Sequence, residues 1–168
     1  MTVITYKDLP KIREKHKDSK IVVCSGSFDI IHAGHILFFE DCKKFGDFLV
    51  TVVAGDEILK KIKGPQRPII TQAARIKHLD SLKPIDYTVL DDFSQNYDNP
   101  LYAIEYAIEL LKPDVYVINK DAFDIPSRKK FCKKLGTRLE LLSRTCPKNF
   151  EGISTSKIIN KIRSLYDR

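Results

Sequence analysis

The chain has 168 residues, with 29 lysines and arginines against 22 aspartates and glutamates, a formal net charge of +7. This length suits one domain with a real core, so we expect a single domain over residues 1–168. No stretch approaches the ~18 consecutive apolar residues of a membrane span, and residues 1–20 lack the apolar core of a signal peptide. The sequence therefore favours a cytoplasmic protein with no membrane partner. The positive charge suits anionic partners such as phosphorylated small molecules or nucleic acid, with simple solubility as the alternative.

The first half of the chain predicts two buried strands separated by helices. The helical spacing of Leu9 and Ile12 predicts a short helix in the lead-in, residues 1–20. Continuous apolar runs indicate buried strands, and apolar stripes that follow a capping residue indicate helices. In chain order, we expect a strand over residues 21–24, a helix over 34–45, a strand over 48–54, a basic loop over 56–69 and a helix over 71–82. Gly64, Pro65 and Pro68 are expected to break any regular element in that loop.

The second half repeats the alternation of strand and helix. We expect strands over residues 86–90, 115–118 and 139–142, a loop over 91–100, and helices over 100–111, 126–135 and 155–166. Strands that alternate with helices of about ten residues imply right-handed crossovers and parallel pairing. The predicted fold class is thus α/β, a Rossmann-like, doubly wound, five-stranded parallel sheet with helices on both faces.

The stretch over residues 21–47 carries the strongest chemical signal. A buried strand is followed by a turn of small residues, then by His32 and His35 three positions apart, and then by a helix that carries Lys44. The free N–H groups of a helix start favour negative oxygens, and side chains three apart on a helix point at one region. The stretch therefore predicts a phosphate site. It is neither a Walker loop nor a G-x-G-x-x-G dinucleotide fingerprint.

The pattern G-x-F-D-x-x-H-x-G-H over residues 26–35 resembles the signature of the cytidylyltransferase-like, HxGH-type nucleotidyltransferases. Four further segments are similar to this family: K-x-G-D over residues 44–47, K-G..R-P over 63–68, K-P-D over 112–114 and G-I-S-T-S-K-I-I over 152–159. Within the family, the chain is most similar to the adenylyltransferase domain of the bifunctional heptose-phosphate enzymes, and next to glycerol-3-phosphate cytidylyltransferase. It departs from these patterns at Ser156, at residues 54–56 and 119–121, and in the longer segment over residues 144–150, so the acceptor stays open.

The resemblance implies a set of site residues. The catalytic group would be His32, His35, Lys44 and Arg75. The nucleotide would be bound by Ser25, Gly26, Ser27, Phe28, Gly34, Asp56, Asp121, Ile153, Ser154, Thr155 and Ser156. Asp56 and Asp121 could equally serve loop structure, Ser154 to Ser156 could also cap their helix, and Asp29 is expected to bond backbone groups rather than a metal. No side chain is assigned to metal; Mg²⁺ would be held mainly by the triphosphate.

The implied reaction joins a nucleoside monophosphate (NMP) to a phosphorylated acceptor and releases pyrophosphate. Adenylyl transfer from ATP to a sugar (heptose) 1-phosphate, for surface-polysaccharide precursors, is the first expectation. CTP-dependent transfer to glycerol 3-phosphate or a related polyol phosphate is the alternative. The resemblance also implies a homodimer and no nucleic-acid partner. A non-catalytic nucleotide-binding module and a nucleic-acid-binding domain remain as rival hypotheses. The basic helix around residues 129–134 is either a solvated face or an anion-binding patch.

Overall fold

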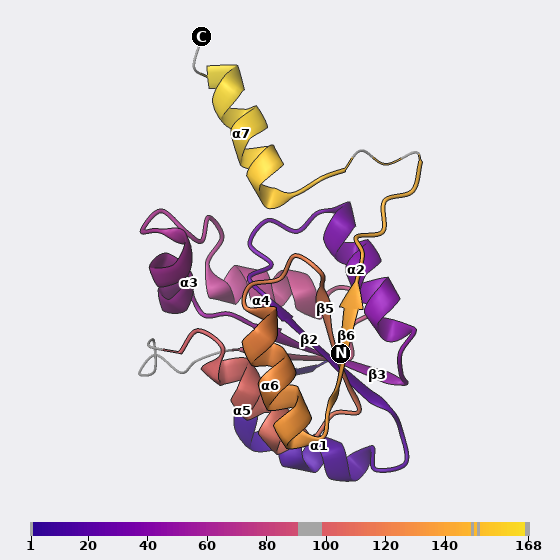
Figure 1. Cartoon of the computed structure of the whole chain (residues 1–168). Helices are drawn as coiled ribbons and strands as arrows, with labels where there is room; N and C mark the ends of the chain where they lie inside the picture. Colours follow the sequence, from indigo (N-terminus) through magenta and orange to yellow (C-terminus); the bar gives the residue numbers. More distant parts are fainter. Residues whose placement is uncertain (1, 91–98, 149, 151, 167–168) are drawn as a thin grey trace.

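Six parallel strands form one sheet in the described part of this protein. The computed structural model describes residues 2–90, 99–148, 150 and 152–166. The strands are β1 (Thr2–Ile4), β2 (Ile21–Gly26), β3 (Phe48–Val53), β4 (Tyr87–Leu90), β5 (Val115–Asn119) and β6 (Arg138–Leu142). They pair in the order β1-β4-β3-β2-β5-β6, every pair parallel, with helices around the sheet (Figure 1). The predicted Rossmann-like α/β class is confirmed.

The five predicted strands are all present, and the prediction of only five was wrong. The sixth strand, β1, lies at the sheet edge beside β4 and has three residues. A strand this short shows no alternating or continuous apolar pattern, so no local pattern predicted it. The lead-in helix predicted within residues 1–20 is present as α1 (Leu9–Lys15), after one 3₁₀ turn (Tyr6–Asp8).

The basic stretch after β3 was predicted to be a loop and instead forms helix α3 (Asp56–Lys63). Gly64 follows its last residue, so the predicted breakers end this helix rather than prevent it. Ile58 and Leu59 are buried, while Lys60 and Lys61 face solvent. The loop predicted over residues 91–100 falls largely on residues 91–98, which lie outside the described part of the chain.

The helices cover the sheet in two groups, because strand side chains alternate between its faces. The other helices are α2 (Ala33–Lys43), α4 (Gln72–Asp80), α5 (Tyr102–Leu111), α6 (Ile125–Leu135) and α7 (Thr155–Tyr166). Val23 and Val50 join a core with α1, α5 and α6, whereas Val22 and Leu49 join a core with α2 and α4. Both faces of the central strands are thus buried, as in doubly wound folds.

The chain changes direction across the sheet between β2 and β5. Strands β3 and β4 follow β2 toward one edge, and the chain then returns to place β5 on the other side of β2. Ligands in open parallel sheets bind beyond the carboxyl ends of the strands at such a switch point. The carboxyl ends of β2 and β5 are Gly26 and Asn119, so this is where a site is expected.

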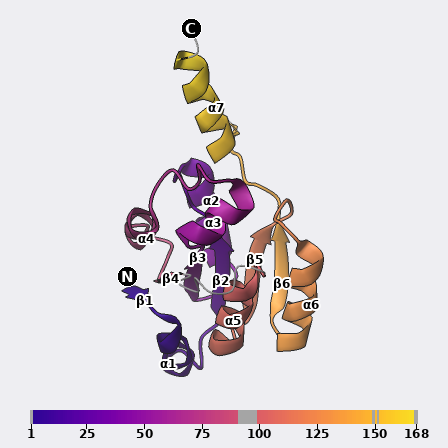
Figure 2. The ribbon, with the colours of Figure 1, turned by 90° about the vertical axis from the view of Figure 1, so that its left-hand side faces the viewer.

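Helix α7 projects from the rest of the molecule, at the end of a long connection that follows β6 (Figures 1 and 2). None of its described residues is buried. Within the described residues, the helices lack the length and apolar character needed to traverse a lipid bilayer.

Candidate active site

The corner between β2 and α2 is built around an inward-facing phenylalanine. Phe28 has a positive φ of 47°, a conformation that bulky residues rarely adopt. Its ring lies against Gly26, where an added Cβ would come within 2.8 Å of ring atom Cζ. The same ring meets His35 edge-on, with ring centroids 5.6 Å apart. The absence of a side chain at Gly26 therefore leaves room for the Phe28 ring, and that ring packs against the imidazole of His35.

His32 and His35 stack at the start of α2. The carbonyl of His32, the N-cap residue, accepts the N–H of His35 at 2.9 Å, and the two ring centroids are 3.9 Å apart. Burial lowers the pKa of His32, and the positive charge of Arg144 adds to this. Burial lowers the pKa of His35 to about 3, with further contributions from His32, Arg144 and Lys63. Both rings are therefore neutral at pH 7, and each can donate one N–H to a phosphate oxygen.

Lys63, the last residue of α3, brings an amine to this corner. Its Nζ donates to the Oγ of Ser27 at 2.5 Å. Burial lowers the pKa of Lys63, and repulsion from Arg67 adds to the effect. An amine whose pKa is lowered among other cations is stabilised by an anion, so this arrangement favours a phosphate group beside Ser27.

Asp29 holds the turn together, as expected. It is 2% exposed, and its carboxylate accepts the backbone N–H groups of Ile69 and Ile70 at 2.9 Å each. The same carboxylate pairs with Arg67 at 2.7 Å. Its oxygens are occupied by the segment after α3, so Asp29 fixes Arg67 at the site.

The predicted phosphate-binding role of Arg75 does not fit its position. Arg75 is fully buried, and its guanidinium donates to the carbonyls of Ile70, Ser27 and Ala54. It also pairs with Asp56 at 2.8 Å, and this ion pair gives Asp56 a role in loop structure. Both side chains tie together the chain segments around the site, and neither lines either of the two cavities found at this edge of the sheet.

Lys44 is also not brought to the histidines. It caps the far end of α2, and nine residues of helix place it about 14 Å along the axis from His35. Its ammonium is 73% exposed and pairs with Asp41 at 2.6 Å. The cationic position at the β2–α2 corner is occupied by Lys63 instead.

The two sequence signatures meet at Gly34. An added Cβ there would lie 3.1 Å from the ring of His32 and 3.5 Å from the carbonyl oxygen of Ile153. The start of α7 follows directly: Ser154 Oγ accepts the N–H of Lys157 at 3.3 Å and so caps the helix. Two helix N-termini are therefore held beside the same pair of imidazoles, and each favours anions.

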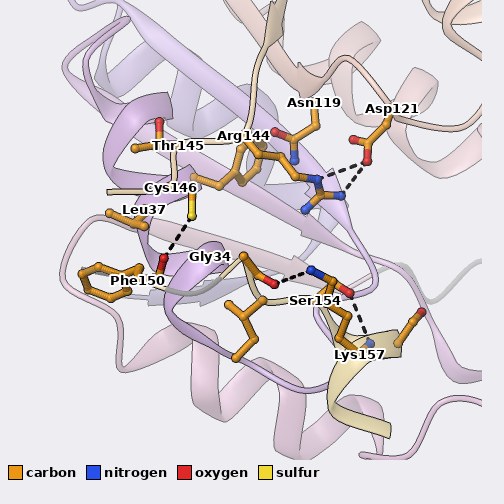
Figure 3. A pocket seen from close by; sticks show the side chains of 14 residues that line it. Gly34, Leu37, Asn119, Asp121, Arg144, Thr145, Cys146, Phe150, Ser154 and Lys157 are labelled. Carbon is orange, nitrogen blue, oxygen red and sulfur yellow. Dashed lines mark hydrogen bonds and ion pairs between the residues drawn. The ribbon is translucent and has the colours of Figure 1, made fainter. Parts of the chain in front are cut away.

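Two adjoining cavities of about 440 Å³ each open at this edge of the sheet. The first lies between α2 and the start of α7 and is lined by Gly34, Ile153, Ser154 and Ser156 (Figure 3). The second lies over the carboxyl ends of the strands; its lining includes Ser25, Gly26, Ser27, Phe28, His35, Lys63, Arg67 and Thr155. The two share Phe38, Asn119, Asp121 and Arg144 as a common wall.

An ion pair stands on that common wall. Arg144 donates from Nε and Nη2 to one oxygen of Asp121, at 3.1 and 2.9 Å (Figure 3). Both side chains are more than half exposed, at 56% and 61%. Arg144 thus places a positive charge between the cavities, close enough to lower the pKa of both histidines.

Residues at the site that were absent from the predicted set include Lys63, Arg67, Asn119 and Arg144. Asn119 ends β5, which lies beside β2, and Arg144 follows β6, so strand ends at the switch-point edge would have indicated both. Lys63 and Arg67 belong to the K-G..R-P segment, whose resemblance was noted without a role. Among the described residues, no group of three or more His, Cys, Asp or Glu side chains is arranged to hold a metal ion.

Comparison with known proteins agrees with this geometry. The profile of the Cytidylyltransferase-like family matches residues 23–161. FAD synthase from Ferroglobus placidus is 35% identical over 147 residues, 87% of this chain and 90% of that protein. Bifunctional protein HldE from Campylobacter jejuni subsp. doylei is 37% identical over 150 residues, 89% of this chain and 29% of that protein. The chain thus spans less than a third of the length of this HldE relative.

Solved structures show the same fold. A lipopolysaccharide core biosynthesis protein from Thermoplasma volcanium superposes with a TM-score of 0.60 at 27% identity, over 77% of this chain and 99% of that one. Pantoate-beta-alanine ligase from Francisella tularensis shares the fold at 15% identity, with a TM-score of 0.68 over 100% of this chain and 80% of that one. The profile match covers most of the chain and includes both signatures that meet at Gly34. The chain belongs to the cytidylyltransferase-like family and is a nucleotidyltransferase.

Proposed function

We propose that the chain transfers an NMP from a nucleoside triphosphate to a small phosphorylated acceptor. An oxygen of the acceptor phosphate attacks the α-phosphorus, the bond from that phosphorus to the bridging oxygen breaks, and pyrophosphate leaves. A phosphate nucleophile is already ionised near neutral pH, so no general base is required. Catalysis then depends on positioning and on stabilising the charge of the transferred group.

The observation that carries this proposal is the contact between the two signatures at Gly34. It sets the neutral N–H donors of His32 and His35 beside the start of α7, with Lys63 and Arg144 close enough to affect the pKa of His35. Two adjoining cavities can hold a nucleotide on one side and an acceptor on the other. Their shared wall is where the α-phosphate would lie.

The acceptor candidates differ in what supports them. Adenylyl transfer to a heptose 1-phosphate is our first candidate, supported by the resemblance to heptose-phosphate enzymes and by the likeness to a lipopolysaccharide core biosynthesis protein. A flavin phosphate is the second, because the FAD synthase relative is matched over 90% of its length. CTP-dependent transfer to glycerol 3-phosphate or a related polyol phosphate is the third.

Magnesium would reach this site with the triphosphate. The described residues offer no cluster of acidic side chains, so the ion would take its ligands mainly from phosphate oxygens and water. It would neutralise part of the triphosphate charge. A homodimer and a cytoplasmic location also remain predictions; sedimentation analysis and cell fractionation would test them.

The test is pyrophosphate release, measured for ATP and CTP against each acceptor. We expect one pair to turn over well above the others. His35→Ala should lower that turnover at least about a hundredfold, because a donor at a developing charge contributes on the order of 3 kcal/mol. His78→Ala, at an exposed position of α4, should leave the rate unchanged. No release with any pair, or near-normal turnover by His35→Ala, would refute the proposal.

A further inference from the structure

Arg128 differs from the other arginines of the molecule. Five arginines in the described part of the chain pair with a carboxylate: Arg13, Arg67, Arg75, Arg138 and Arg144. Arg163 lies on the exposed face of α7. Arg128 is only 9% exposed, yet no described carboxylate lies within ion-pair distance of it. It is a nearly buried positive charge with no direct ion pair to a described carboxylate. Hydrogen bonding with Ser127 lowers the pKa of Asp124, the residue before α6, and the charge of Arg128 helps to lower it from beyond ion-pair distance.

Neutral groups hold the guanidinium in place. Nε donates to the carbonyl of Phe123 at 2.8 Å, and Nη1 donates to the hydroxyl of Tyr116. Tyr116 is fully buried, and its hydroxyl also bonds the Oγ of Ser25 at 2.7 Å. No hydrogen bond from Nη2 to the described residues accompanies these two. These two bonds to neutral groups fix the guanidinium, and they leave its positive charge without a direct ion pair among the described residues.

Arg128 lines the second cavity, as does Ser25 at the end of β2. Burying a charge without a partner is costly, and a protein keeps such a group where something else supplies the opposite charge. Helix α6 itself contains no acidic residue, and its other cations, such as Lys129 and Lys130, face solvent. Since no described carboxylate pairs directly with Arg128, its place in the cavity lining points to an anion bound in that cavity.

We propose that Arg128 binds a second anionic group of the acceptor, a carboxylate or a second phosphate. This rests on the proposed transfer to a phosphorylated acceptor. The reacting phosphate would lie near Lys63 and Ser27, and the second anion near Ser25. Ser27 lies two residues after Ser25, just past the end of β2, so the two anions would be about 7 Å apart. Within the class of sugar 1-phosphates, this spacing favours one that carries a further anionic group over a heptose with a single phosphate.

Three sugar phosphates that differ only at one carbon test the idea. They are glucose 1-phosphate, glucuronic acid 1-phosphate and glucose 1,6-bisphosphate, which carry a hydroxyl, a carboxylate and a phosphate at that carbon. Calorimetric binding to the full chain, at one ionic strength, should show at least tenfold tighter binding of one or both of the last two. The stronger of the two identifies the anion. Wild-type protein that binds all three equally, or none of them, overturns the proposal.

Variants then assign the preference to Arg128. Arg128→Met should reduce the preference to less than threefold, and Arg128→Lys should retain part of it. Arg13→Met removes an arginine whose partner, Asp114, precedes β5 at the opposite end of the strands, and should leave the preference intact. A preference that persists in folded Arg128→Met overturns the assignment. If that variant does not fold, Arg128→Lys decides: unchanged affinities for all three compounds overturn the assignment.

Binding is read without turnover, so the two proposals fail separately. Absence of pyrophosphate release would refute the transfer reaction while the binding preference could still be measured. Turnover with a singly charged acceptor, together with equal binding of the three sugars, would refute only the role of Arg128.

Discussion

The two halves of the site are held in opposite ways. At the β2–α2 corner the supporting groups are buried: Asp29 is 2% exposed and Arg75 is fully enclosed. In the connection between β6 and α7, the supporting pair of Arg144 and Asp121 is more than half exposed on both sides. Thr145 fastens the same connection to α2 through Asp41, also at an exposed position. One half of the site is therefore built into the core, and the other is attached at the surface.

This difference separates two tasks. Buried ion pairs with saturated hydrogen bonds fix geometry, because breaking one leaves an uncompensated charge. Exposed pairs contribute little to stability and are screened by salt. The structure therefore holds the histidines ready before substrate arrives, whereas Arg144 owes its place to a weak surface pair. The same substitution in each half, aspartate to asparagine, measures this contrast directly.

Asp29→Asn should have the largest effect. The amide cannot accept all the bonds now made by the carboxylate, and it leaves Arg67, which is 18% exposed, without its counter-charge. Losing one partner of a buried pair costs about 3–5 kcal/mol, so we expect a loss of that order in the free energy of unfolding. Urea unfolding at pH 7 measures it. A loss below about 1 kcal/mol would show that the corner is not held by this carboxylate.

The pH dependence of stability gives a smaller effect from the same half. The pKa of His35 is lowered from 6.5 to about 3 in the folded protein. Above pH 6.5 both the folded and unfolded states are neutral at this residue, so it contributes no pH dependence. As the pH falls from 6.5 toward 3, the unfolded state takes up a proton that the folded state does not, and stability falls.

Between pH 7 and pH 5 this loss should be about 1–2 kcal/mol, allowing for the partial exposure of the ring. Unfolding of wild type and His35→Gln across this range isolates the contribution, because the glutamine does not titrate. Parallel curves for the two proteins would contradict a buried neutral imidazole. Direct titration of the ring by NMR should find it uncharged at pH 5.

The contrast between the halves also explains what the sequence could predict. The strand-turn-helix of β2 and α2 has local patterns, so its elements and the convergence of His32 and His35 followed from spacing. Spacing did not predict which cation would lie beside these histidines. Lys44 lies in the expected helix but about 14 Å along it from His35. Lys63 reaches the turn after β2 only because α3 ends beside it, where Lys63 bonds Ser27.

Arginines show the same limit. Arg75, Arg128 and Arg144 are alike in sequence, and only their contacts in the folded chain separate Arg75, which ties loops together, from the two that line a cavity. Two of the three backbone carbonyls that Arg75 contacts, those of Ser27 and Ala54, come from chain segments distant in sequence. Such meetings depend on tertiary structure, which local pattern does not encode. The sequence does predict where the site residues would lie, namely at the carboxyl ends of the strands beside the switch point.

Asp121→Asn should have the smallest effect on stability and tests the surface half. Both partners are exposed, so we expect the free energy of unfolding to change by less than about 1 kcal/mol. Triphosphate affinity should rise a few-fold, because a negative charge is removed beside the cavities and Arg144 is released from its pair. The gain should shrink as salt is raised, since exposed charges are screened. Calorimetric titration with ATP and CTP at two ionic strengths measures the affinity and its dependence on salt. A stability loss equal to that of Asp29→Asn would end the distinction between the halves, because it would place Arg144 in a pair as firmly fixed as the buried corner.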